Sequence, residues 1–182
     1  YNGYIRENND KLLCTLDDII DVSNMEVGTF NFHFEEIDID QLCKNYIDGV
    51  KEKVNEGVQC IYNPMQRGLR ITSDKKRIGQ VLYNLLTNAC KYAFDATDPR
   101  RAFAVVVTLE RRGEDVALTV ADNGRGVPEA WCPEESASLG FRVIRGLVSQ
   151  LRGSLSWRSG AGRGLEVSVL FPMPGGKDAP GR

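Results

Sequence analysis

Hydrophobic residues recur at helical spacing in four stretches of the chain. In residues 4–24, Ile5, Leu12, Leu16 and Ile19 form one apolar stripe, which predicts an N-terminal helix that needs a partner helix to cover it. The same spacing predicts helices over 38–55, 74–94 and 138–151. Short polar residues stand at their starts as candidate caps: Asp38 or Asp40, Ser73 or Asp74, and Ser138.

Alternating and β-branched patterns between these helices predict short strands. They fall around Phe30, Phe32 and Phe34, and over 58–63, 69–72, 103–110, 115–121, 154–158 and 165–171. Strands interleaved with helices that are apolar on one side predict the α/β class, as a two-layer α/β sandwich. A mixed sheet is then covered on one face by the three inner helices. The Gly- and Pro-rich residues 173–182 predict a disordered tail.

Composition narrows the function classes. The chain has 182 residues and a net charge of −2, so no basic field favours nucleic acid as a partner. No apolar run approaches the roughly 20 residues of a membrane-spanning helix. The five cysteines are odd in number and unclustered, and His33 is the only histidine. These features argue against a zinc site or a disulfide framework and favour a reducing, cytoplasmic location.

Residue usage changes midway along the chain. Up to residue 94 there are seven Lys, four Arg and ten Asn, whereas from residue 95 there are one Lys, eleven Arg and one Asn. A single hydrophobic core gives no physical reason for such a change in Lys, Arg and Asn usage. Two interpretations remain open: chance combined with a functional difference between the halves, or a natural or engineered chimera joined near 89–102.

The helix predicted over 74–94 carries Asn84, Asn88 and Lys91 on one polar stripe. Asparagine is a poor residue for a helix interior because its amide competes for backbone hydrogen bonds. A solvated face is one explanation. The other is a ligand face, on which an amide oxygen binds Mg²⁺ and the lysine meets phosphates as a point charge.

A strand ends at Asp122, and Gly124 and Gly126 follow it. By itself this pattern favours an Asx turn, in which the carboxylate binds its own backbone. The two glycines also allow a flat ligand to lie against the chain, and a carboxylate there can accept a hydrogen bond from an exocyclic amine. Further on, Gly140 opens a helix whose free N–H groups favour a phosphate.

The order of these motifs is more specific than any one of them. "NLLTNACKY", "DNGRGVP", "SLGFRVIRGLV" and "SGAGRGLEVSVLFP" follow one another over residues 84–172. The set resembles the ATP-binding domain of histidine kinases, in the Bergerat-fold superfamily, and the resemblance covers residues 38–172. Residues 1–27 resemble that family's second dimerisation helix, and residues 28–37 resemble its linker strand.

The resemblance implies ATP and Mg²⁺ as ligands and assigns roles to single residues. Asn88 is implied as the Mg²⁺ ligand with Asn84 in support, Lys91 as a phosphate contact and Tyr92 as a wall of the nucleotide site. Asp122 is implied as the acceptor for the adenine amine. The glycines complete the site: Gly124 and Gly126 shape the adenine pocket, and Gly140 lies at the phosphates.

The resemblance also implies partners. The γ-phosphate would pass to a histidine on a dimerisation helix of the same or a partner subunit, and from there to a response regulator. A homodimer through residues 4–24 is a further expectation, and the parent protein could be membrane-anchored. His33 lies outside any phosphoacceptor signature, so this chain is expected to bind nucleotide without phosphorylating itself.

Departures from the family pattern keep alternatives open. The segment between Val127 and Ser138 is short, Phe141 follows Gly140 where leucine is common, and Leu165 stands where threonine is usual. The first two of these features resemble the HWE-like subgroup. The short segment, Leu165 and the mixed composition also suit a degenerate or engineered module that serves as a scaffold with weak or no nucleotide binding. A serine kinase of the anti-sigma type is a third reading, against which the N-terminal helix argues.

Overall fold

The computed structural model describes residues 32–51, 57–94, 102–128, 139–159 and 163–173. Three features expected from the sequence lie outside these residues: the helix over 4–24, the cap at Ser138, and the tail after residue 173. The elements below belong to the described part of the chain.

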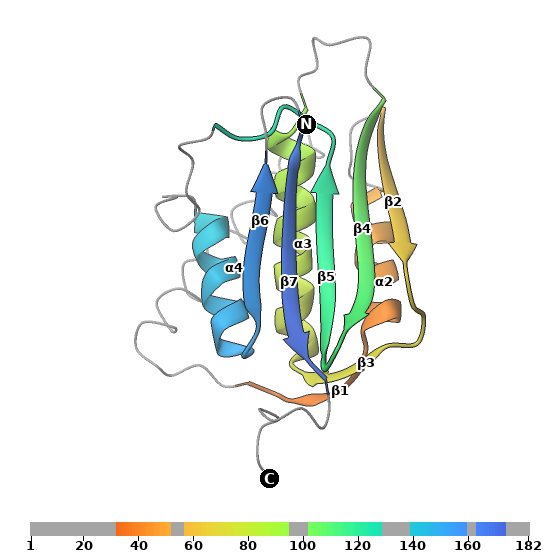
Figure 1. The fold of residues 1–182 in the computed structure, drawn as a ribbon, viewed down its shortest axis with the longest axis vertical. Coiled ribbons are helices and arrows are strands. Elements are labelled where there is room, and N and C mark those ends of the chain that lie inside the picture. The colour runs from red at the N-terminus through yellow and green to blue at the C-terminus, as the bar shows by residue number, and fades with distance from the viewer. Residues whose placement is uncertain (1–31, 52–56, 95–101, 129–138, 160–162, 174–182) are drawn as a thin grey trace, which may run out of the picture.

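A five-stranded mixed sheet forms one layer of the fold (Figure 1). Its strands, in spatial order, are β2 (Val58–Pro64), β4 (Phe103–Arg112), β5 (Asp115–Asp122), β7 (Leu165–Pro172) and β6 (Ser154–Ser159). The pair β2–β4 is parallel and the other three pairs are antiparallel. The mixed sheet predicted from the sequence is therefore confirmed.

Three helices form the second layer: α2 (Ile39–Lys51), α3 (Lys75–Tyr92) and α4 (Leu139–Gln150). All three lie on the same side of the sheet, with α3 in the middle (Figure 1). Their apolar stripes pack on the strand residues that face them, because alternate residues of a strand point to the same face. The core contains Leu82 of α3, Val107 of β4 and Ile144 of α4, each with no exposed surface. The predicted two-layer α/β sandwich is confirmed.

The strand predicted around Phe30, Phe32 and Phe34 is displaced. The observed strand is β1 (Glu35–Asp38), which pairs with β3 (Arg70–Ser73) as a separate antiparallel sheet. Phe32 and Phe34 precede β1 and lie in no strand; their ring centroids are 5.9 Å apart. Phe30 lies outside the described residues, and the position of β1 follows from its pairing with β3.

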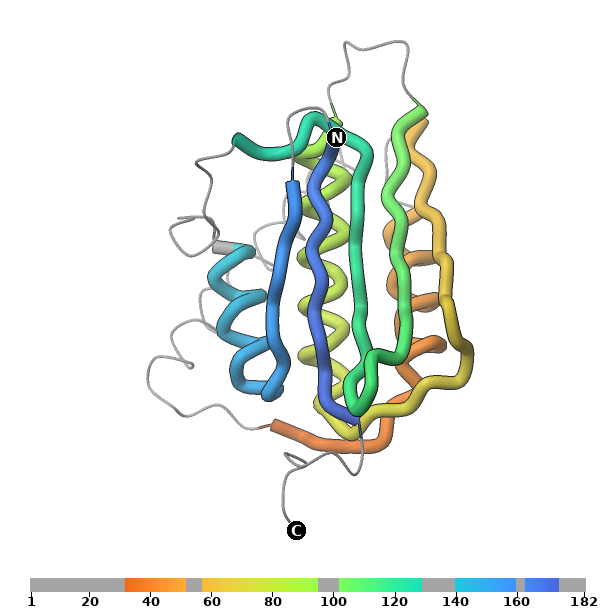
Figure 2. The backbone as a smooth tube through the Cα atoms, viewed as in Figure 1, coloured from red at the N-terminus to blue at the C-terminus, as the bar shows by residue number. Residues whose placement is uncertain are grey.

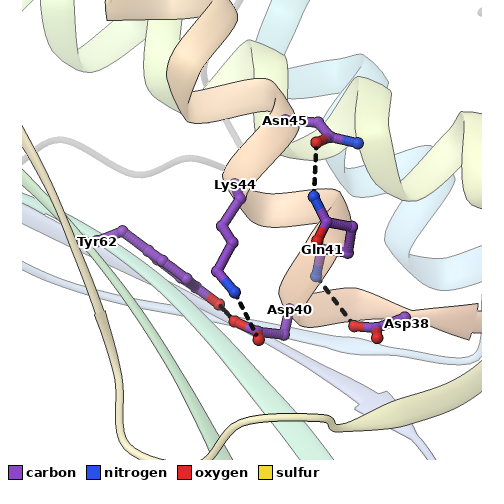
Figure 3. A network of polar contacts seen from close by, with 6 residues as sticks. All are labelled: Asp38, Asp40, Gln41, Lys44, Asn45 and Tyr62. Carbon is purple, nitrogen blue, oxygen red and sulfur yellow. Dashed lines mark hydrogen bonds and ion pairs between the residues drawn. The ribbon is translucent and has the colours of Figure 1, made fainter.

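A polar network around the buried Asp40 joins the start of α2 to the sheet (Figure 3). Asp38 is the cap of α2, since its Oδ1 accepts the backbone N–H of Gln41 at 3.0 Å. Asp40 has a different role. Its two carboxylate oxygens accept the Tyr62 hydroxyl at 2.6 Å and the Lys44 ammonium at 2.9 Å, so this buried carboxylate links α2 to β2.

The start of α3 is also fixed by a buried carboxylate. Asp74 is the N-cap, and its Oδ1 accepts the backbone N–H of Arg77 at 3.1 Å. Its Oδ2 accepts the backbone N–H of His33 at 2.9 Å. Asp74, rather than Ser73, is therefore the cap, and it ties the segment before β1 to the helix that carries the two asparagines.

Candidate functional site

Three segments that carry the predicted site residues meet at one end of the fold. The carboxyl end of β5, the carboxyl end of α3 and the amino end of α4 all lie at this end (Figure 1). The segment after β5, teal in Figure 2, leaves the sheet beside the end of α3. The last turns of α3 and residues 122–126, which are far apart in the sequence, are thereby brought to the same end of the molecule.

Asp122 is the last residue of β5 and is partly buried. Its Oδ1 accepts two backbone N–H groups, that of Gly124 at 2.9 Å and that of Leu165 at 3.3 Å. The first contact is the Asx turn expected from the sequence. Within the described residues no hydrogen bond reaches Oδ2, so one carboxylate oxygen is fixed and the other is left as an acceptor. Burial raises the pKa of Asp122, although the two N–H groups act in the opposite direction.

The glycines beside Asp122 have different structural reasons. Gly126 has φ of +71°, the left-handed region that favours glycine. Gly124 is not in that region; a Cβ there would lie 2.1 Å from the carbonyl oxygen of Ala93, just beyond α3. The N–H of Arg125 donates to the same oxygen at 2.9 Å. Gly124 is therefore needed for the close approach of the loop to α3, not for a positive φ.

Asn84, Asn88 and Gly140 are brought together from α3 and α4. A Cβ on Gly140 would lie 3.6 Å from Asn88 Nδ2, 3.8 Å from Asn88 Oδ1 and 3.9 Å from Asn84 Oδ1. A side chain at position 140 would therefore lie in van der Waals contact with both amides, which shows how closely the start of α4 approaches them. Asn84 Nδ2 is buried and has no hydrogen-bond partner among the residues that the structure describes. A buried orphan donor beside a Cβ-free helix start fits a bound oxyanion, and the amide oxygens fit Mg²⁺, which takes oxygen ligands.

Lys91 and Tyr92 occupy the last turn of α3. Both are exposed, Tyr92 to 63%. No described contact joins either side chain to Asp122 or to the asparagine pair. The fold therefore places them at the correct end of the helix but does not itself assemble them with the other site residues.

Sequence reasoning missed the backbone contribution of the β6–β7 connection. Gly164 has φ of +79°, and a Cβ there would lie 1.8 Å from the carbonyl oxygen of Asp122. The N–H of Leu165 reaches the Asp122 carboxylate. The sequence signal was the glycine-rich "SGAGRG", but a backbone N–H is the same in every residue type except proline, so the identity of residue 165 does not indicate this contact.

The family is identified by a match over residues 73–175 to the model described as histidine kinase-, DNA gyrase B-, and HSP90-like ATPase. This match covers more than half of the chain, and the chain belongs to that family. Its curated relatives and structural neighbours include histidine kinases.

Two curated relatives illustrate the similarity. The autoinducer 2 sensor kinase/phosphatase LuxQ of Vibrio parahaemolyticus is 28% identical over 193 residues, which is 93% of this chain and 22% of that protein. The cell-division control histidine kinase PdhS of Brucella suis is 29% identical over 200 residues, 94% of this chain and 19% of that protein. The chain spans about a fifth of the length of these relatives.

Two solved structures share the fold. The histidine kinase AdeS of Acinetobacter baumannii has a TM-score of 0.77 at 16% identity, covering 94% of this chain and 83% of that one. Full-length ShkA in complex with AMPPNP has a TM-score of 0.77 at 23% identity, covering 93% of this chain and 37% of that one.

Among the residues that the structure describes, no helix is long and apolar enough to cross a membrane.

Proposed function

We propose that this domain binds Mg-ATP and, in the complete protein, supplies the γ-phosphate to a histidine outside this chain. One observation carries the proposal. A carboxylate with one oxygen fixed by two backbone N–H groups lies at the same end of the fold as an asparagine pair facing a helix-opening glycine. The first is suited to an adenine amine and the second to phosphates with a divalent cation.

In this proposal the adenine amine donates to Asp122 Oδ2, while Gly124 and Gly126 leave room for the base. Desolvation of the site strengthens that hydrogen bond, because water competes less well with the amine for a partly buried acceptor. Burial also raises the pKa of Asp122, so the acceptor is lost on acidification. We therefore expect nucleotide affinity to decrease as the pH is lowered toward the pKa of this carboxyl group.

Asn88 Oδ1 would hold Mg²⁺ with Asn84 in support, and Asn84 Nδ2 would donate to a phosphate oxygen. Gly140 would bring the backbone N–H groups of α4 to the phosphates, and Lys91 and Tyr92 would complete the site from the end of α3. Mg²⁺, when bound, supplies charge neutralisation for phosphates. The side chains provide no nucleophile, so catalysis would rest on positioning and electrostatics.

The remaining assignments also belong to the proposal. Residues 1–27 would be the second dimerisation helix, 28–37 a linker strand, 38–172 the ATP-binding domain and 173–182 a tail. The phosphoacceptor helix of the same or a partner subunit and a response regulator would be the partners of the parent protein. A homodimer through 4–24 and a cytoplasmic location of this domain are further parts of it. ShkA, crystallised with AMPPNP, supports the choice of ligand.

Calorimetric titration with Mg-ATP tests the proposal on the full 182-residue chain. We expect the parent chain to bind Mg-ATP. Asp122→Asn should lower the affinity at least about tenfold, which is equivalent to one hydrogen bond to a charged group. Asn88→Ala should abolish the dependence of binding on Mg²⁺. Asp115→Asn, at the opposite end of β5, and Asn45→Ala on α2 are the matched controls. Absence of heat and of a thermal shift for the parent chain would contradict nucleotide binding.

A scaffold module is the second candidate, favoured by leucine at position 165 and by the short stretch between Val127 and Ser138. Both features remove family residues near the nucleotide. A folded parent chain that binds no nucleotide would support this candidate. If the chain does bind nucleotide, a phosphoacceptor helix supplied in trans with labelled ATP would distinguish a domain that only binds ATP from one that also transfers phosphate.

A further inference from the structure

The hydroxyl group of Ser159 bridges the two segments that surround Asp122. Ser159 is the last residue of β6, and its Oγ donates to the carbonyl oxygen of Gly164 at 2.8 Å. The same Oγ accepts the backbone N–H of Val127 at 3.0 Å. One hydroxyl thus acts as donor to the β6–β7 connection and as acceptor from the loop that follows β5.

The Gly164 contact acts on the peptide group that holds Asp122. The carbonyl of Gly164 and the N–H of Leu165 belong to the same planar peptide unit. Ser159 binds this unit at its oxygen, and Asp122 Oδ1 binds it at its N–H. The hydroxyl therefore fixes the orientation of the peptide plane and, by polarising it, strengthens the N–H bond to the carboxylate.

The Val127 contact acts on the other N–H donor to Asp122. Gly124 donates to Asp122 Oδ1, and the loop then continues through Gly126, at positive φ, to Val127. The Val127 N–H is held by Ser159. The loop that supplies one N–H and the peptide that supplies the other are consequently tied to the same hydroxyl, so a closed ring of contacts surrounds the carboxylate.

We infer that Ser159 is a positioning residue for adenine recognition: its hydroxyl holds both backbone donors on Asp122 Oδ1 and so aims Oδ2 at the exocyclic amine. This inference rests on the proposed function. Ser159 itself need not touch the nucleotide. Its contribution is to hold the carboxylate in the correct orientation. A hydrogen bond from the amine depends on this orientation, because hydrogen bonds weaken steeply when they are misaligned.

The test compares ATP with purine riboside triphosphate, which lacks only the exocyclic amine. For the parent chain we expect ATP to bind about tenfold more tightly, which corresponds to one hydrogen bond. Ser159→Ala should reduce that preference to about threefold or less by weakening ATP binding selectively, within the same hydrogen-bond range. A purely structural defect would weaken both ligands equally.

Two variants accompany Ser159→Ala. Ser159→Thr keeps the hydroxyl and suits a strand, so it should restore the preference for ATP. Ser156→Ala removes an exposed hydroxyl three residues earlier on the same strand and should leave the preference unchanged. Circular dichroism and urea unfolding of each variant confirm that a folded domain is being compared.

Hydrogen exchange provides a readout that needs no nucleotide. In Ser159→Ala, the amides of Leu165 and Val127 should exchange faster, whereas amides in the middle of β5 should not change. A folded Ser159→Ala variant with unchanged preference for ATP, equal loss of both ligands, or unchanged exchange at Leu165 overturns the inference. Failure of the parent chain to bind ATP instead contradicts the proposed function, and the inference falls with it.

Discussion

At the scale of single residues, Asp122 shows how one side chain can serve both the fold and a ligand. Oδ1 is occupied by the N–H groups of Gly124 and Leu165, and this pairing makes a partly buried carboxylate tolerable. The oxygen that the fold does not use is the one that the proposed adenine contact needs. The Asx-turn interpretation and the ligand interpretation of the sequence are therefore compatible.

The pH dependence of stability tests the burial of Asp122. Its pKa in the folded chain is raised above the ordinary value of 3.8, so the folded state binds the proton more tightly than the unfolded state does. The stability due to this group is present at low pH and is lost as the pH rises from 3.8 through the folded pKa. Asparagine cannot ionise and can still accept both N–H groups.

For Asp122→Asn we therefore expect the free energy of unfolding, relative to the parent chain, to increase as the pH rises across that range and then to level off. Urea unfolding of the nucleotide-free proteins at a series of pH values measures it, with Asp115→Asn as the control for loss of one charge. A difference between variant and parent that does not change with pH would show that burial does not perturb this carboxyl group.

A second residue-scale prediction concerns Gly124. Alanine there would place Cβ 2.1 Å from the carbonyl oxygen of Ala93, a backbone atom that cannot rotate away. We expect Gly124→Ala to lower the free energy of unfolding by about 1–3 kcal/mol and to weaken nucleotide binding. Both quantities are measured by urea unfolding and calorimetry.

Gly49→Ala is the matched control, since a Cβ at this position on α2 would meet nothing within 4 Å. Alanine is the better helix former, so this variant should gain up to about 1 kcal/mol. If Gly124→Ala proved as stable as Gly49→Ala, the close approach of the β5 loop to α3 would not be a constraint.

At the scale of elements, carboxylates at the starts of α2 and α3 connect each helix to a segment distant in the sequence. Asp74 connects α3 to the segment before β1, and Asp40 connects α2 to β2. Desolvation opposes ionisation of Asp40, but the Tyr62 hydroxyl, the Lys44 ammonium and the Gly68 backbone together outweigh it and lower the pKa of Asp40. The sheet edge at β2 is thereby fixed to the helix that covers it.

Tyr62→Phe tests this connection. It removes the 2.6 Å hydrogen bond to Asp40 and should cost about 1–3 kcal/mol near neutral pH, as expected for a hydrogen bond to a charged group. Because the folded pKa of Asp40 lies below 3.8, the stability from its ionisation is present above that pH and is lost as the pH falls through the folded value.

The destabilisation by Tyr62→Phe should accordingly diminish under strongly acidic conditions. Urea unfolding at neutral and at acidic pH provides the measurement. Tyr83→Phe, which removes a partly buried phenolic hydroxyl from α3, is the control. An equal loss at both pH values would mean that the ionised carboxylate is not what Tyr62 stabilises.

At the scale of the whole molecule, one core joins the helix layer to the sheet, and the site depends on it. Leu82 lies in the middle of α3 with no exposed surface, between the strands and the neighbouring helices. We expect Leu82→Ala to lower the free energy of unfolding by about 2–5 kcal/mol through lost burial and a cavity. Chemical denaturation checks this value.

Ile61→Ala serves for comparison, because Ile61 is 42% exposed on the edge strand β2. Its loss should be clearly smaller, since less apolar surface leaves the core. Equal losses at the two positions would show that the core does not extend between α3 and the sheet in the way described.

Much of this architecture was predictable from local patterns. The stripe of Ile78, Leu82 and Leu85 predicted α3 and the face it buries, because helical periodicity records which side meets the core. Alternation in 103–110 and 115–121 predicted β4 and β5 for the same kind of reason. The phenylalanine alternation before β1 predicted a strand a few residues too early. The position of β1 depends on pairing with β3 about 35 residues away, and no local pattern encodes such pairing.

The sequence by itself determined the inner helices, the strands of the five-stranded sheet, the two-layer class and the residue types at the candidate site, because periodicity, caps and turn chemistry are local properties. Only the tertiary structure decided that Gly140 faces Asn84 and Asn88 and that position 124 has no room for a Cβ beside the Ala93 carbonyl. It also decided that Leu165 and Ser159 act on Asp122 through backbone groups. Backbone N–H and C=O groups are the same in every residue type, so their partners become known only when distant segments are packed together.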